Sequence, residues 1–119
     1  MSIHVTLTHN KELINDLLST LFETSYSDFW LSYNVKYNKK MKGTYYDLIE
    51  KYDAILLEDA EDPEEKWTLS RDKMRRGFEL LDHHDWEAFG RIAKNDGAWD
   101  TEDADQWLQY SLIETIIYS

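Results

Sequence analysis

The amino-acid sequence predicts an α+β fold, in which a small antiparallel sheet packs against several helices and the C-terminal half is mostly helical. Three observations support this prediction. Apolar residues recur at helical spacing in residues 10–23, two short apolar runs flank an acidic turn in residues 54–69, and residues 70–119 contain three stretches of helical periodicity. The 119 residues suffice for one hydrophobic core, so we expect a single domain over residues 1–119.

The N-terminal segment is predicted to contain a strand followed by a helix. Apolar and polar residues alternate over residues 3–7, which is typical of a short, half-buried strand. Residues 10–23 are predicted to form an amphipathic helix, with Thr8 or Asn10 available as its N-cap. The apolar face of this helix consists of Leu13, Ile14, Leu17, Leu18, Leu21 and Phe22.

The middle of the chain is predicted to supply the rest of the sheet. A period-two pattern over residues 29–37 indicates a strand that ends in a polar, basic turn. Residues 45–52 are compatible with either a helical turn or a strand. Residues 54–58 and 66–69 flank an acidic turn centred on Pro63, so we expect them to form a β-hairpin.

Three helices are expected in the last 50 residues or so, separated by short breaks. Their predicted N-caps are Ser70, then Asp85, then Asp100 or Thr101, and residues 95–99 break the chain before the third helix. The residues expected to face the core are Met74, Gly77, Phe78 and Leu81 in the first, Trp86, Phe89, Gly90 and Ala93 in the second, and Ala104, Trp107, Leu108, Ser111, Leu112 and Ile116 in the third.

The composition excludes several classes of protein. The chain has no cysteine, which excludes disulfides, thiolate metal sites and cysteine nucleophiles and favours a cytoplasmic location. It has neither an 18-residue apolar run nor a signal-peptide pattern, so we expect no membrane association. A net charge of −11 disfavours direct binding to nucleic acid.

The negative charge is concentrated in two segments, residues 53–65 and residues 96–119, neither of which contains a lysine or arginine. Such segments have two interpretations: a solvated face that confers solubility, or an acidic surface that binds a partner. The candidate partner-binding residues are Asp53, Glu58, Asp59, Glu61, Asp62, Glu64, Glu65, Asp96, Asp100, Glu102, Asp103 and Asp105.

No constellation of residues indicates an enzyme, a catalytic residue or a cofactor. The adjacent His83 and His84 diverge on any regular element and cannot chelate a metal together. The acidic segments lack the residue order of a calcium-binding loop, and the four glycines are too scattered to cradle a phosphate. A metal-dependent hydrolase built on Asp, Glu and His83 is the remaining enzymatic alternative.

The spacing of the carboxylates suggests what an acidic surface could imitate. Carboxylates at i and i+2 of a strand are about 6.6 Å apart, and those at i and i+4 of a helix are about 6 Å apart along the axis. Both spacings approach two base steps of DNA, at about 3.4 Å each. The acidic turn and the start of the last helix could thus occupy a DNA-binding groove, provided that they fall on one side of the molecule.

In size, charge, lack of cysteine and its opening residues, the chain resembles the small acidic DNA-mimic proteins of bacteria and phages, and it is similar to the type that binds the histone-like protein HU. The resemblance implies a monomer or small homo-oligomer whose acidic surface binds a basic DNA-binding protein and competes with DNA. An alternative is a phage counter-defence function, in which the protein is an anti-CRISPR or anti-restriction inhibitor. Its acidic surface would then block a basic nucleic-acid channel.

The C-terminal half carries a second resemblance, to small phage proteins of unknown function. It rests on Trp67-Thr68-Leu69-Ser70-Arg71-Asp72-Lys73, Gly77, Leu80-Leu81, Ala104-Asp105-Gln106-Trp107-Leu108-Gln109 and Ile117-Tyr118. The chain ends in Tyr118-Ser119, where such proteins commonly have Tyr-Gly. This resemblance implies a prophage origin and no particular reaction.

Overall fold

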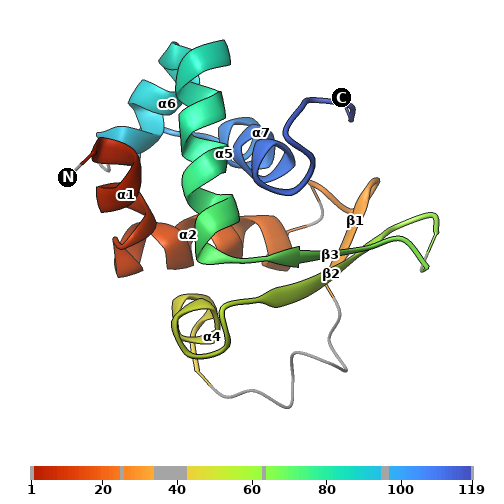
Figure 1. Ribbon diagram of the computed structural model, residues 1–119. Helices are drawn as coiled ribbons and strands as arrows, with labels where there is room; N and C mark the ends of the chain where they lie inside the picture. Colours follow the sequence, from red (N-terminus) through yellow and green to blue (C-terminus); the bar gives the residue numbers. More distant parts are fainter. Residues whose placement is uncertain (1, 25, 34–42, 63, 95–96, 119) are drawn as a thin grey trace.

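The computed structural model describes residues 2–24, 26–33, 43–62, 64–94 and 97–118, and it shows a three-stranded sheet beside a group of helices (Figure 1). The predicted α+β fold is confirmed. The described helices are α1 (Ile3–Thr8), α2 (Lys11–Glu23), α4 (Tyr45–Tyr52), α5 (Arg71–His84), α6 (Trp86–Ala93) and α7 (Thr101–Ile113). The strands are β1 (Leu31–Tyr33), β2 (Ile55–Asp59) and β3 (Lys66–Leu69).

The prediction of a strand over residues 3–7 is wrong, because this segment is helix α1. The Ser2 side chain accepts a hydrogen bond from the Val5 amide and so caps the helix. The imidazole of His4 then lies 2.9 Å from the Asp82 carboxylate of α5 and 5.4 Å from the ring of Phe89 in α6. These contacts hold the segment on α5 rather than at an edge of the sheet.

Helices α2 and α4 each begin at an N-cap residue, whose side chain accepts a hydrogen bond from the amide three residues later. Asn10 caps α2 by accepting from the Leu13 amide at 3.1 Å, which confirms the predicted helix and its N-cap. Residues 45–52 are a helix, α4, and not a strand. Thr44 and Asp47 form a capping box there, in which each side chain accepts from the other residue's amide.

The sheet is antiparallel, with β2 between β1 and β3. The predicted hairpin is confirmed, with Ile55 opposite Leu69 and Glu58 opposite Lys66. The strand predicted over residues 29–37 is described only at Leu31–Tyr33, since residues 26–30 form a turn and residues 34–37 lie outside the described residues. The indole of Trp30 takes part in side-chain hydrogen bonds described below.

All three C-terminal helices begin where the sequence predicts. The side chains of Ser70, Asp85 and Asp100 accept hydrogen bonds from amides three residues later. Two predicted core residues are exposed instead. Trp86 is 70% exposed in the first turn of α6, and Ile116 lies beyond the end of α7, which is closed by a left-handed Glu114.

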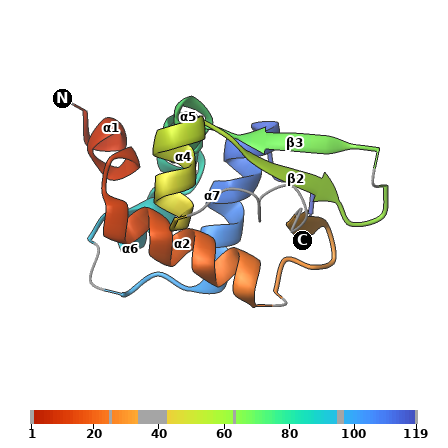
Figure 2. The ribbon, with the colours of Figure 1, turned by 90° about the horizontal axis from the view of Figure 1, so that it is seen from below.

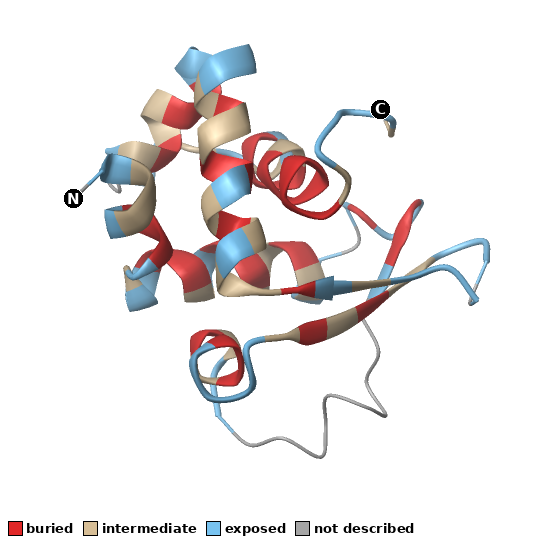
Figure 3. Cartoon of the chain, viewed as in Figure 1, coloured by how far each residue is buried: buried red, intermediate tan, exposed pale blue. Residues whose placement is uncertain are grey.

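Helix α5 contacts α1, α6 and α7, and it lies in the middle of the helical group (Figure 1). Its buried face meets α7, where the ring of Phe78 stacks on Trp107 and the Trp107 indole donates to the Met74 carbonyl at 3.2 Å. Figure 3 shows the buried positions gathered where α2, α5, α7 and the sheet face one another. Gly77 allows the closest approach, because a Cβ there would lie 1.9 Å from the Ser111 hydroxyl.

We predict that Gly77→Ala lowers the free energy of unfolding by about 1–3 kcal/mol, since overpacking against Ser111 outweighs the better helix propensity of alanine. Gly90→Ala is the matched control. A Cβ at Gly90 meets nothing within 4 Å, so this change should stabilise the protein by about 0.5–1 kcal/mol. Urea denaturation of both variants measures the difference, and equal effects would contradict the close approach of α5 and α7.

Candidate functional site

In the acidic turn between β2 and β3, the aspartates accept hydrogen bonds from backbone amides and the glutamates are exposed. One Asp59 oxygen accepts from the Glu61 and Asp62 amides at 2.8 and 3.1 Å, and an Asp62 oxygen accepts from the Glu64 amide at 3.1 Å. These aspartates therefore organise the turn. The side chains of Glu61, Glu64 and Glu65 are exposed, and Figure 3 shows the described part of the hairpin tip as exposed.

At the start of α7, two of the predicted partner-binding acids are exposed and two are buried. The predicted surface is wrong for the buried pair. Asp100 and Glu102 are exposed, whereas Asp103 is only 1% exposed and receives two hydrogen bonds, of 2.7 and 2.8 Å, from the Arg91 guanidinium. This bidentate pairing joins α6 to α7 and raises the pKa of Arg91 above its ordinary value. Asp105 is 5% exposed, so neither it nor Asp103 is available to a partner.

The Asp105 carboxylate lies at the centre of a buried network. It accepts from the Ser27 hydroxyl at 2.5 Å, from the Trp30 indole at 2.8 Å and from the Gln109 amide at 2.8 Å. The Gln109 side chain in turn accepts from the backbone amides of Ile117 and Tyr118, both at 3.0 Å. One helix, α7, thus holds both the turn at residues 26–30 and the C-terminal tail.

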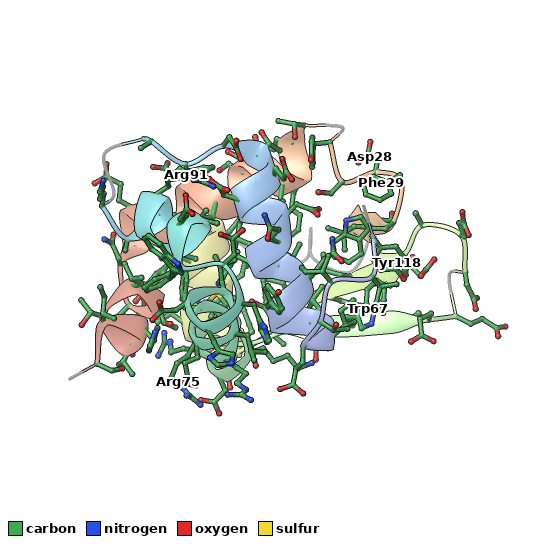
Figure 4. The ribbon with its side chains drawn as sticks, turned by 90° about the horizontal axis from the view of Figure 1, so that it is seen from above. Asp28, Phe29, Trp67, Arg75, Arg91 and Tyr118 are labelled. Carbon is green, nitrogen blue, oxygen red and sulfur yellow. The ribbon has the colours of Figure 1, made fainter. Side chains whose placement is uncertain are left out.

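A series of aromatic rings connects this network to the hairpin. Phe29 meets Tyr118 edge to face at a centroid distance of 6.5 Å, Tyr118 stacks on Trp30 at 4.9 Å, and Trp30 meets Trp67 of β3 at 5.7 Å. Figure 4 shows Asp28, Phe29, Tyr118 and Trp67 along the hairpin side of the molecule. The Tyr118 hydroxyl donates to Asp59 at 3.3 Å, which ties the tail to the acidic turn.

The turn at residues 26–30 lies between the two acidic segments. Burial and then the charges of Glu102, Asp105 and Asp100 raise the pKa of Tyr26. Burial, then the charge and hydrogen bond of Asp59 and the charges of Glu65 and Glu61, raise the pKa of Tyr118, whose ring touches Phe29. We name the following set the acidic edge: the exposed Asp28, Glu61, Asp62, Glu64, Glu65, Asp100 and Glu102, with the rings of Tyr26 and Phe29.

Four other predicted partner-binding residues are not part of this edge. The carboxylate of Asp59 is engaged by the turn amides and the Tyr118 hydroxyl. Asp53 ends α4 in a left-handed conformation and accepts from the Arg71 amide at 3.4 Å. It precedes β2, at the end of that strand opposite to the acidic turn. Glu58 lies within the sheet between Ser32 and Lys66. Asp96 lies outside the described residues.

The sequence does not mark Asp28 and Phe29 as surface residues. Phe29 opens the period-two pattern that predicts a strand over residues 29–37, yet it is 49% exposed in the turn before β1, beside the 46% exposed Tyr26. The tail residue Tyr118 is likewise not marked. Local patterns do not place the turn at residues 26–30 correctly, because Asp105, about 75 residues further along the chain, fixes it.

The described residues offer no arrangement for a metal site. Within them, no three His, Asp or Glu side chains are grouped so as to hold an ion. His83 and His84 meet edge to face, and His84 stacks on Tyr110 of α7. None of the described helices is long and apolar enough to span a bilayer.

We predict that Asp105→Asn destabilises the protein by about 2–3 kcal/mol, because the amide that replaces one oxygen faces buried donors and leaves them unsatisfied. Glu102→Gln, an equally conservative change on the exposed side of the same helix, should alter stability by less than about 0.5 kcal/mol. Chemical denaturation followed by tryptophan fluorescence compares the two. Similar values for both variants would show that the network around Asp105 contributes little.

Alkaline pH provides a separate test of the tail. Because the pKa of Tyr118 is raised in the folded protein, the stability it contributes is fully present below the unfolded value near 10 and is lost as the pH rises through the folded value. We expect Tyr118→Phe to show a shallower loss of stability between pH 9 and 11 than the unaltered protein. Urea denaturation across this range measures the slope, and an unchanged slope would contradict the environment described for Tyr118.

Comparison with known proteins assigns no function to this chain. No protein-family model matches the chain, and no curated protein and no solved structure is significantly similar to it. The resemblance to DNA-mimic proteins thus remains a hypothesis that depends on size and charge.

Proposed function

We propose that this protein is a DNA mimic, whose acidic edge binds a basic DNA-binding protein and competes with DNA for it. The observation that supports the proposal is the position of the turn at residues 26–30: Ser27 and Trp30 donate to Asp105 near the start of α7, and the Trp30 carbonyl accepts from the Ala60 amide of the hairpin at 3.0 Å. Two acidic segments separated by 30 residues of sequence thereby border the same turn. We favour a histone-like protein of the HU type as the target.

Three exposed glutamates of the edge have no structural role among the described residues, whereas Asp62 orders the turn and Asp100 caps α7. The side chains of Glu61, Glu64 and Glu102 make no hydrogen bond or ion pair with the residues that the structure describes, in contrast to the buried Asp103 and Asp105. Unpaired carboxylates repel one another, so their grouping costs stability unless something else favours it. A basic partner would relieve this repulsion.

The distribution of the basic residues agrees with a surface directed at such a partner. Arg75 and Arg76 belong to α5, where they pair with Glu79, and Arg76 also pairs with Glu114. Figure 4 shows Arg75 on the side of the molecule away from Asp28 and Phe29. Arg75 and Arg76 are thus paired within the helical group and not with the acids of the acidic edge.

We expect the triple variant Glu61→Gln, Glu64→Gln and Glu65→Gln to fold normally and to bind HU about tenfold more weakly, given about 0.5 kcal/mol for each exposed ion pair. The salt dependence of binding should also decrease. The readout is displacement of a fluorescent DNA duplex from HU, measured over a range of salt concentrations.

A control with the same net charge separates the edge from a general charge effect. Asp16→Asn, Glu50→Gln and Glu87→Gln remove three exposed acids from α2, α4 and α6. This control should displace DNA as well as the unaltered protein does. Equal weakening by the two triple variants would refute a localised binding surface.

The counter-defence alternative uses the same edge against a different target. If the protein fails to displace DNA from HU but blocks the DNA channel of a CRISPR nuclease or a restriction enzyme, and the edge variant loses this effect, the mimicry is retained and the HU assignment is wrong. If no basic partner is affected, the exposed acids serve solubility alone.

A further inference from the structure

The acidic edge contains an exposed aromatic ring that mimicry of phosphates alone does not require. Phe29 is 49% exposed and directly follows the exposed Asp28 in the turn before β1. Tyr26, 46% exposed, lies in the same turn. Exposed aromatic residues are enriched in protein interfaces and provide a large contact area at little conformational cost.

Contacts with buried and half-buried side chains fix the position of the Phe29 ring. Its ring contacts Tyr118, which stacks on the buried Trp30, and the Trp30 indole is fixed by the Asp105 carboxylate. A partner that contacts Phe29 therefore loses little entropy in ordering it, because the ring already rests on a fixed support. This rigidity distinguishes Phe29 from an aromatic side chain that is merely exposed.

An aromatic face beside carboxylates favours one type of cation over another. The planar guanidinium of arginine stacks on an aromatic ring and donates paired hydrogen bonds to a carboxylate at the same time. The ammonium of lysine is compact and strongly hydrated, so it gains less from the ring. Here the ring belongs to Phe29, and the adjacent carboxylate belongs to Asp28.

We infer that Phe29 and Asp28 receive an arginine side chain of the partner, so that the acidic edge prefers an arginine-rich protein surface to a lysine-rich one. The inference rests on the proposed function and specifies the chemistry of its partner. Charge complementarity alone would bind both kinds of surface equally. The aromatic ring provides the discrimination.

Two synthetic peptides of equal length and charge test this inference, one with arginine and one with lysine at alternate positions between alanines. Binding is measured by isothermal titration calorimetry at two salt concentrations. The unaltered protein should bind the arginine peptide more tightly, and Phe29→Leu should reduce the ratio of the two Kd values about threefold. The loss should come from weaker binding of the arginine peptide, with the lysine peptide nearly unaffected.

Two further variants keep the result interpretable. Phe29→Tyr keeps an aromatic ring and should keep the preference for the arginine peptide. A merely structural role of the side chain would not require this result. Tyr52→Leu removes a ring of similar exposure, 47%, at the end of α4, and it should leave the ratio unchanged. Circular dichroism confirms that each variant is folded.

The outcomes distinguish this inference from the function on which it rests. An unchanged ratio in Phe29→Leu overturns the role of the ring. If both peptides still bind more weakly to the triple glutamine variant, the acidic surface itself stands. Failure of both peptides to bind the unaltered protein overturns this inference, and displacement of DNA from HU then tests the proposed function separately.

Discussion

The buried carboxylate of Asp105 organises the part of the molecule that we propose to be functional. Burying a charged group is costly unless its oxygens are hydrogen-bonded, and here the hydroxyl of Ser27, the indole of Trp30 and the amide of Gln109 all donate to it. Through Gln109 the same network holds the backbone of the C-terminal tail. The position of Phe29 and the contact of the tail with the hairpin both depend on this one side chain.

Residues of one chemical type have different roles at the start of α7 because successive side chains on a helix point about 100° apart. Asp100 caps the helix, Glu102 extends into solvent, and Asp103 and Asp105 face inward to donors. A run of acids without a nearby base is therefore partly compensated by groups distant in sequence, such as Arg91. Of the acids at the start of α7, only the exposed Asp100 and Glu102 are available for binding.

The helices provide the fixed support for this arrangement. Figure 2 shows α7 crossing α2, with the turn at residues 26–30 following the end of α2, so both ends of that turn are anchored. The close contact at Gly77 and Ser111 sets the separation of α5 and α7. The turn at residues 26–30 is fixed on these packed helices, and a preorganised turn reduces the entropic cost of binding a partner.

Features that depend on neighbouring residues can be predicted from the amino-acid sequence. These are the N-caps at Asn10, Ser70, Asp85 and Asp100, the buried face of α2 and the hairpin around the acidic turn. A cap acts through a hydrogen bond to an amide three residues away, so it can be read locally.

Whether a given apolar or acidic side chain faces the core or the solvent depends on long-range packing. Residues 3–7 form a helix because α5 and α6 offer His4 its partners, and Trp86 is exposed because no element covers the first turn of α6 among the described residues. Asp105 is buried because Ser27 and Trp30, about 75 residues earlier, donate to it. Burial and pairing of this kind depend on contacts between segments far apart in the sequence, and local patterns do not specify them.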